Sequence, residues 1–244
     1  MQHHWHIIQL DEVDSTNNYA RLLFDKNKLK EETVVNAFFQ NKGRGQQNNS
    51  WISERGKNLT FTLILFTRYL KAEKQFYLSM AVSLGIIDFL KSKNIDAKIK
   101  WPNDIYTGKG KIAGILVENS ILHEDLLNSF VGIGLNVNQE KFQDINAQSM
   151  KTVTSVNYDL EETLNRLLEF LNFQIQRLKE NQFNLIKTEY LRNLTGFKEK
   201  RKFSAESRIF YGKIMDVEEN GQLVIKNAEG KKLKFMFKEV TLID

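Results

Sequence analysis

Three polar segments of this chain carry residue types suited to binding an anionic substrate. The first runs from Gln40 to Trp51 and contains Gly43-Arg44-Gly45, in which two glycines flank an arginine. Backbone N–H groups exposed at glycines, together with a guanidinium, can bind a phosphate or a carboxylate. Taken alone, the segment is more typical of a polar surface loop, because an isolated Gly-Arg-Gly triplet is common.

The second segment reads Lys-Trp-Pro-Asn-Asp at 100–104 and is followed by Lys111. We expect strands at 97–101 and 111–118 to form a hairpin around the glycine-containing turn at 107–110, which would bring Lys111 close to Asp104. A carboxylate and an ammonium paired there could hold a metal–nucleotide and a substrate carboxylate. The alternative is a surface ion pair worth less than ~1 kcal/mol. The turn is not a P-loop, because it lacks the GxxxxGK[ST] spacing and a following helix.

The third segment, Gly-Ile-Gly-Leu-Asn-Val at 132–137, places Gly132 and Gly134 inside a predicted strand and ends with Asn136. Glycines in a strand mark the close approach of a ligand or another backbone, or a β-bulge, and both interpretations are open. A dinucleotide-binding fingerprint is excluded, because the third glycine and the start of a helix are missing.

The elements around these segments predict an α+β protein with a mixed sheet. β-branched and apolar stretches predict strands at 4–10, 34–39, 59–65 and 130–137. A cluster of N-cap residues predicts a helix after residue 14, and helical periodicity predicts others at 75–91, at 160–179 and ending near 194. After Gly196 the apolar period changes to two, which predicts short strands and a small SH3-like β-barrel. The predicted domains are 1–192 and 193–244.

Composition excludes several classes of protein. The 244 residues include no cysteine and a single proline, Pro102. Disulfide scaffolds, Cys-ligated metal sites and thiol nucleophiles are therefore excluded. No apolar run is long enough for a membrane span, and the N-terminus lacks a signal-peptide pattern, so we expect a cytoplasmic protein without a membrane partner. His3, His4 and His6 have no partner at metal-ligand spacing and are interpreted as incidental.

The net charge of +5 raises the question of nucleic-acid binding. Residues 192–244 hold 12 Lys+Arg against 8 Asp+Glu, so nearly all of the excess lies in the C-terminal part. There the charges are single residues spread through strand-like sequence, which is more typical of a solvated β surface. We therefore expect no nucleic-acid partner.

Taken together, the order and spacing of the motifs resemble the biotin protein ligases. The resemblance is carried by Ser-Thr-Asn at 15–17, by Gln40 with the Gly-Arg-Gly loop, by 100–104, by Lys111 with Gly-Ile-Leu-Val-Glu at 114–118, and by Gly132, Gly134 and Asn136. It implies a catalytic domain of the class II aminoacyl-tRNA synthetase/biotin ligase type with a C-terminal SH3-like barrel. It also implies that the chain uses ATP and Mg²⁺ to convert biotin to biotinyl-5′-AMP, and then transfers biotin to a lysine of a carboxyl carrier domain.

By resemblance, the site residues divide into three groups. The catalytic groups are Lys111, Arg44 and Asp104. The residues implied to bind biotin are Ser15, Thr16, Asn17, Gln40, Arg44, Gln46, Lys111, Gly114 and Leu116. Those implied to bind the nucleotide are Gly43, Gly45, Trp51, Asn103, Asp104, Lys111 and Asn136, with Asp104 also implied as the Mg²⁺ ligand. Trp51 and Trp101 are expected either to wall the site or to serve as core residues.

The sequence departs from the family pattern in the loop and at the N-terminus. Many members carry further arginines in the loop, where this chain has Gln46, Gln47 and Asn49. We therefore expect weaker retention of the adenylate, or greater reliance on Lys42 and Arg55. The first catalytic strand is predicted within ten residues of Met1, so we expect a monofunctional ligase without the DNA-binding domain of bifunctional relatives.

Two rival functions are open at this stage. A lipoate or octanoyl ligase of the same superfamily would use the same adenylation chemistry, but lacks the combination of motifs at 100–104 and 114–118. A non-catalytic biotin- or nucleic-acid-binding module is a rival from a different class. The resemblance also implies a possible homodimer through an exposed sheet edge. The sequence does not define the isomer of the Trp101–Pro102 bond.

Overall fold

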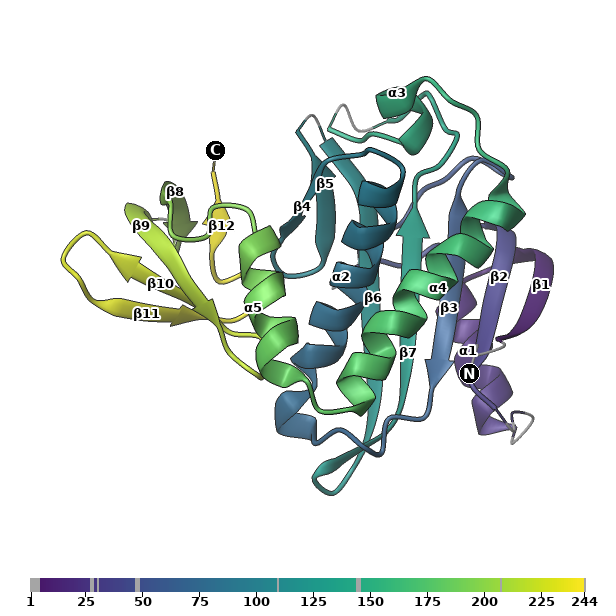
Figure 1. Cartoon of the computed structure of the whole chain (residues 1–244), viewed down its shortest axis with the longest axis horizontal. Helices are drawn as coiled ribbons and strands as arrows, with labels where there is room; N and C mark the ends of the chain where they lie inside the picture. Colours follow the sequence, from purple (N-terminus) through teal and green to yellow (C-terminus); the bar gives the residue numbers. More distant parts are fainter. Residues whose placement is uncertain are drawn as a thin grey trace.

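The computed structural model describes residues 5–26, 29, 31–46, 49–108, 110–143, 146–206 and 208–243. It contains a mixed seven-stranded sheet flanked by helices and, beside it, a five-stranded antiparallel sheet (Figure 1). The predicted α+β class and two-sheet architecture are confirmed. In spatial order the large sheet consists of β1 (His6–Val13), β2 (Thr33–Gln40), β3 (Leu59–Leu65), β7 (Asp125–Leu135), β6 (Gly110–Leu122), β5 (Asp104–Thr107) and β4 (Ala97–Lys100).

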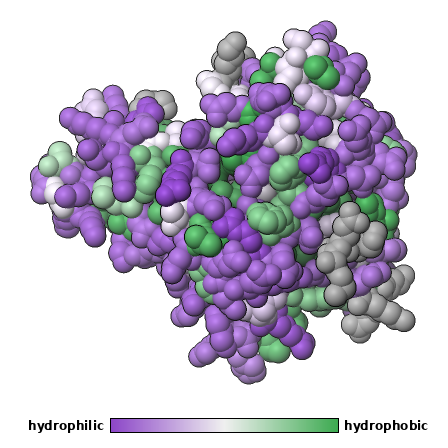
Figure 2. All heavy atoms as spheres, in the orientation of Figure 1, coloured by the Kyte–Doolittle hydropathy of each residue, from purple (hydrophilic) through white to green (hydrophobic). Residues whose placement is uncertain are grey.

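Helices lie on both faces of the large sheet. On one side are α2 (Phe76–Ser92), α4 (Leu160–Lys179) and α5 (Phe183–Asn193), and on the other is α1 (Thr16–Asp25) (Figure 1). The outward surface over the first group is mainly hydrophilic, with scattered apolar residues (Figure 2). The main hydrophobic core therefore lies between this helical layer and the sheet. A smaller cluster around Ala20, Val35, Ile64 and Phe130 holds α1.

The helical layer follows from apolar periodicity and capping. Apolar residues at 3.6 spacing give α4 a single buried face, which includes Leu164, Leu168, Leu171 and Ile175. Its first turn is capped by Asp159, whose carboxylate accepts a hydrogen bond from the Glu162 N–H. In contrast α2 is buried nearly all round, because it lies between the sheet and the other helices.

The structure corrects the predicted hairpin. The strands at 97–101 and 111–118 do not pair with each other, because β5 lies between β4 and β6 and pairs antiparallel with both. β5 has no separate signal in the sequence, because its four residues follow Pro102 and Asn103 without an apolar run of their own. The short helix α3 (Met150–Thr154) was also not predicted, and its signal is the capping box formed by Ser149 and Thr152. The predicted proximity of Lys111 and Asp104 is nevertheless correct.

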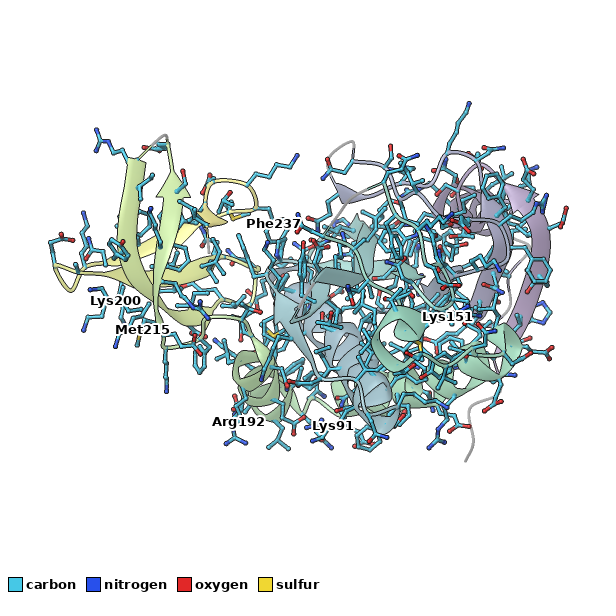
Figure 3. The ribbon with its side chains drawn as sticks, turned by 90° about the horizontal axis from the view of Figure 1, so that it is seen from above. Lys91, Lys151, Arg192, Lys200, Met215 and Phe237 are labelled. Atoms are coloured by element: carbon cyan, nitrogen blue, oxygen red, sulfur yellow. The ribbon has the colours of Figure 1, made fainter. Side chains whose placement is uncertain are left out.

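The small sheet has the order β11 (Lys232–Phe235), β10 (Leu223–Asn227), β9 (Arg208–Val217), β8 (Lys200–Ala205) and β12 (Thr241–Leu242). It docks onto the body through the loop at 218–222 and through Phe237, which lies at the junction (Figure 3). The ring of Phe237 contacts those of Phe76 and Trp101, with centroids 6.0 and 5.4 Å apart. The carbonyl of Gly221 accepts a hydrogen bond from Trp101 Nε1 at 3.0 Å.

Two further features bear on the predictions made above. α5 ends at Asn193 and β8 begins at Lys200, while the division into domains 1–192 and 193–244 stays a prediction. Among the described residues, no helix combines the length and the apolar character needed to span a membrane.

The docked loop generates a prediction about Gly221. Its φ is +95°, and a Cβ there would lie 2.8 Å from the Phe76 ring and 3.0 Å from that of Phe237. We expect Gly221→Ala to lower the free energy of unfolding by about 3 kcal/mol, from backbone strain plus overpacking, measured by urea titration. Gly230 is the control, because it has φ +86° but its nearest neighbour would be 3.8 Å away. Gly230→Ala should therefore cost only about 1 kcal/mol. Equal decreases in the free energy of unfolding for the two variants would contradict the close packing of the loop at 218–222 against Phe76 and Phe237.

Candidate active site

The candidate site is built on the face of the large sheet that carries α1. The register aligns one row of residues across β3, β7, β6 and β5, namely Thr60, Gly134, Gly114 and Asp104. The next row contains Thr62, Gly132 and Leu116. Residues opposite each other in neighbouring strands point to the same face. The middle of this face therefore has a floor of three glycines, and side chains stand only at its edges.

Other side chains occupy the space that this floor leaves open. A Cβ on Gly134 would lie 2.3 Å from the Trp51 ring, and one on Gly132 would lie 2.4 Å from Asn17 Oδ1. A Cβ on Gly114 would lie 3.1 Å from Trp51 and 3.2 Å from Lys111 Nζ. The paired glycines thus mark close approach of other groups, and the β-bulge interpretation of residues 132–134 is wrong.

A cavity of about 220 Å³ lies above the glycine floor. Its walls include most of the residues that the resemblance assigned to biotin or the nucleotide: Ser15, Thr16, Asn17, Gln40, Arg44, Gly45, Gln46, Trp51, Asn103, Asp104, Lys111, Gly114 and Leu116. Gly43 is buried behind this wall, where a Cβ would lie 2.3 Å from the Trp51 carbonyl oxygen. The fold therefore brings together segments that are more than one hundred residues apart in the chain.

One end of the cavity is a network of neutral hydrogen-bonding groups. Gln40 Oε1 accepts from the Thr16 N–H at 2.7 Å and from Thr16 Oγ1 at 3.1 Å. The hydroxyl of Thr62 lies 2.8 Å from Thr16 Oγ1 and 2.6 Å from Asn17 Oδ1. These side chains are largely buried, so their orientations are fixed before a ligand arrives. Such an array suits a polar, uncharged head group. Ser15, the N-cap residue of α1, lies beside it.

The cationic end is shaped by a β-bulge in β6. Ile105 pairs with Ala113, but the next residue, Tyr106, pairs with Lys111, so Ile112 is an extra residue in the strand. Strict alternation from the buried Ala113 would place Lys111 in the core. The bulge buries Ile112 instead and turns Lys111 to the cavity, as bulges near functional sites often do. There Lys111 Nζ lies 2.7 Å from Asp104 Oδ1 and 5.4 Å from the centroid of Trp51.

The described arms of the loop, residues 43–46 and 49–51, pair with each other as a small hairpin. The Trp51 N–H donates to the Gly43 carbonyl at 2.9 Å, and the Gly45 N–H donates to the Asn49 carbonyl at 2.7 Å. Arg44 extends from the hairpin to the body and forms an ion pair with Glu118, with Nη2 2.9 Å from Oε1. Gln47 lies outside the described residues, so the structure does not bear on that part of the predicted arginine-poor loop.

The two tryptophans have different roles. Trp51 lines the cavity. Trp101 is not among the described residues that line it, and its ring packs against that of Phe237. The Trp101–Pro102 bond is cis. Asn103, two residues on, faces the cavity and also holds β6, because its Nδ2 donates to the Ile115 carbonyl at 2.8 Å.

Asn136 lines a second cavity of about 500 Å³, which shares Ser50, Trp51 and Lys111 with the first. Its Nδ2 donates to the Gln148 carbonyl at 2.9 Å, so the side chain holds the connection after β7. A role of Asn136 near a nucleotide stays a prediction. The second cavity adjoins the cationic end of the first, which leaves room for a ligand larger than one cavity alone can hold.

Four residues that line the cavity or bond to its lining residues were not assigned a role in the site from the sequence. Phe237 and Lys238, in the loop between β11 and β12, line the cavity, although they are distant in sequence from every motif. Thr62 and Glu118 bond to motif residues, and the motif at 114–118 ends with Glu118. The only available signal was the strand period, which places Thr62 on the same face as Thr60. Phe237 and Lys238 had no local signal.

The glycine floor generates a testable prediction. Gly134→Ala places a methyl group within the Trp51 ring, so the ring must leave its position above the sheet. We expect biotin, the ligand implied by the family resemblance, to bind at least ~10-fold more weakly, a loss of about 1.4 kcal/mol, measured by calorimetry. Gly108→Ala is the control, because a Cβ there meets nothing within 4 Å. Unchanged affinity in Gly134→Ala would show that the ring position is unimportant.

Comparisons with known proteins agree with this geometry. Residues 10–136 match the Biotin/lipoate A/B protein ligase family. This span contains all the described residues that line the first cavity except Phe237 and Lys238. The Bifunctional ligase/repressor BirA of Bacillus spizizenii is 27% identical over 234 residues, which cover 93% of this chain and 71% of that protein. Biotin–protein ligase 2 of Arabidopsis thaliana is 39% identical over 106 residues, covering 42% of this chain and 32% of that one.

Among solved structures, the biotin protein ligase from Aquifex aeolicus in complex with biotin and ATP superposes with a TM-score of 0.81 at 27% identity. The superposition covers 98% of each chain and therefore includes the small sheet. The expected resemblance to biotin protein ligases is confirmed. This chain belongs to the biotin/lipoate A/B protein ligase family.

Proposed function

We propose that this protein is an ATP-dependent ligase that activates biotin as biotinyl-5′-AMP and transfers the biotinyl group to a lysine of a carrier domain. The observation that carries this proposal is the division of one cavity into a neutral hydrogen-bonding end and a cationic end. The relative that superposes on 98% of the chain was solved with biotin and ATP bound.

The neutral end suits the ureido head of biotin. A ureido group presents one carbonyl acceptor and two N–H donors, and the network of Thr16, Asn17, Gln40 and Thr62 offers both kinds of partner. Because these side chains are already bonded to one another, little reorganisation is needed when the ligand binds. The apolar part of biotin would then lie over the glycine floor against Trp51.

The cationic end suits the adenylation step. An oxygen of the biotin carboxylate attacks the α-phosphorus of ATP, a C–O–P linkage forms, and the bond to the β-phosphate breaks with release of pyrophosphate. Two anions must approach each other for this reaction, so cations aimed at both lower the barrier. Lys111, which pairs with Asp104 and lies over the Trp51 ring, would contact both anions. Arg44 would cover the acyl phosphate from the hairpin.

Transfer to the carrier follows from the same intermediate. The amine of a carrier lysine attacks the acyl carbonyl, an amide forms, and AMP leaves with the bonding electrons. The amine must be neutral to attack, and Asp104, the one acidic side chain among the described residues that line the cavity, would accept its proton. Since the chain has no cysteine, the acyl group is carried on AMP and forms no thioester with the enzyme.

Mg²⁺ would enter with ATP, since this ion binds through one or two carboxylates plus substrate phosphates. Asp104 fits such a role, and among the described residues no cluster of three His, Cys, Asp or Glu side chains forms a separate metal site. The need for ATP makes the cytoplasm the proposed compartment. The homodimer through an exposed sheet edge stays a prediction. We infer that such an interface would use the outer edge of β1, which has no strand partner in the described part of the chain.

The second candidate is a lipoate or octanoyl ligase, because the matching family includes both activities. Those acids have no ureido group, so they would leave the polar groups at the neutral end without ligand partners. A site built to hydrogen-bond its ligand rejects an analogue that lacks the matching groups, because the analogue displaces water without replacing its hydrogen bonds. The network therefore favours biotin.

The proposed function predicts ATP-dependent transfer of biotin to a carrier domain, which can be measured as an increase in the mass of the carrier. With biotin, we expect the carrier mass to increase by one biotinyl group, and with lipoate or octanoate we expect no change. Lys111→Ala should reduce the rate by at least ~100-fold, the usual scale for removing a group that stabilises transition-state charge. Asp125→Asn, which breaks an exposed ion pair with Lys71 far from the cavity, should be unaffected. Labelling by lipoate and not by biotin would reject the proposal.

The arginine-poor loop generates a second prediction. Arg44 is the single arginine between Gln40 and Trp51, so one guanidinium covers the acyl phosphate where many family members have more. We expect biotinyl-5′-AMP to dissociate faster than from an arginine-rich relative, and Gln46→Arg to slow this release. The dissociation rate can be measured by trapping labelled adenylate. Release as slow as in the arginine-rich enzyme would contradict the expectation.

A further inference from the structure

Glu118 is an acidic group at the edge of the active site that the proposed reaction does not use. It lies on β6 in the row next to Leu116, and 21% of its side chain is exposed. A carboxylate near a bound acyl phosphate opposes binding, because like charges repel. Its presence beside the site therefore requires a compensating role.

The contacts of Glu118 connect two separate parts of the site. Its Oε1 accepts from Arg44 Nη2 at 2.9 Å. Its Oε2 accepts from Asn17 Nδ2 at 3.0 Å and lies 3.4 Å from Arg44 Nη1. One carboxylate thus holds an amide of the neutral end and the guanidinium of the loop. The two oxygens and the negative charge of the carboxylate let it bind both donors at once.

Asn18 holds the same guanidinium from the side of α1. Its Oδ1 accepts from Arg44 Nη1 at 2.7 Å, while its Nδ2 donates to Asp14 Oδ2 at 2.7 Å. Burial raises the pKa of the Asp14 carboxyl, but hydrogen bonds from Asn18 and from the Ser15 backbone and the charge of Lys42 lower it on balance. Asp14 therefore stays ionised at neutral pH and keeps the Asn18 amide oxygen turned toward Arg44.

Arg44 connects the hairpin at 43–51 with the body through these contacts. A guanidinium has five N–H donors, and its contacts with Glu118 and Asn18 use three of them. No described residue accepts from the Nε–H or from the second Nη2–H, so these two donors can contact a ligand. Arg44 can therefore remain bound to Glu118 and Asn18 while it also contacts an acyl phosphate.

We propose that Glu118 and Asn18 are positioning residues, which hold Arg44 and its hairpin over the cavity before the ligand binds. This inference rests on the proposed function, since it assigns Arg44 to the adenylate. The carboxylate of Glu118 repels the negative charge of the adenylate, but it also fixes the Arg44 guanidinium, which holds the adenylate in the site. The loop contains a single arginine, so its position determines how long the adenylate stays bound.

The test is Glu118→Gln in the full-length chain. A glutamine has an NH2 group in place of one oxygen, so it loses the charge of the ion pair and one of the acceptor positions that face Arg44, while its remaining oxygen can still accept from Asn17. We expect biotinyl-5′-AMP to dissociate ~10-fold faster, corresponding to about 1.4 kcal/mol, and amide hydrogen exchange at Gly45 and Trp51 to increase in the unliganded protein. Asp125→Asn, which also neutralises one exposed carboxylate of an ion pair, should change neither quantity.

Two further variants separate positioning from a general structural effect. In an Arg44→Ala background, Glu118→Gln should change the dissociation rate by less than ~2-fold, because its effect passes through Arg44. Asn18 is exposed on α1, so Asn18→Ala should fold normally, and we expect it to accelerate release ~3-fold.

The inference is overturned if Glu118→Gln releases the adenylate at the wild-type rate or more slowly, or if its effect persists without Arg44. Slower release would mean that Glu118 competes with the ligand for Arg44. If the wild-type protein makes no biotinyl-5′-AMP in a rapid-quench assay, the proposed function fails instead. Hydrogen exchange at Gly45 and Trp51 still tests the positioning role in that case, since it needs no activity.

Discussion

The site depends on a stretch of β-sheet that carries no side chains. Gly114, Gly132 and Gly134 lie in register on one face, and the residues that make the cavity occupy the space where their side chains would stand. Glycine normally weakens a strand by its backbone entropy. The central strands can contain it because their opposite face is packed with large apolar residues under α2, such as Phe61, Ile133 and Leu135. The core on one face therefore stabilises the strands that form the bare floor on the other.

Function follows from the two ends of this floor. At one end, Thr16, Asn17, Gln40 and Thr62 form a buried neutral network, and at the other a β-bulge turns Lys111 from the core to the cavity. The loop between β11 and β12 adds Phe237 and Lys238 to the wall of the cavity, although it belongs to the small sheet and not to the sheet that forms the floor. Its close docking on Phe76 and Trp101 is therefore part of how the site is completed.

How far the sequence predicted these features depends on the range of the interactions involved. The helix at 160–179 was predicted with its observed bounds, because apolar period and caps are local properties. Lys111 was correctly paired with Asp104, although β5 was missed and the predicted strand pairing was wrong. The positions of Trp51 over Gly134 and of Phe237 at the cavity depend on tertiary packing, which leaves no periodic signal. Glu118 was visible in its motif, but its role depends on a contact with Arg44, 74 residues away.

The central claim is that this cavity activates the biotin carboxylate with ATP. Biotin-dependent exchange of labelled pyrophosphate into ATP tests it most directly, because it reports adenylation alone and needs neither a carrier nor product release. We predict exchange that requires biotin, is not supported by lipoate, and is lost in Lys111→Ala. Exchange that proceeds without biotin, or equally well with lipoate, would contradict the account.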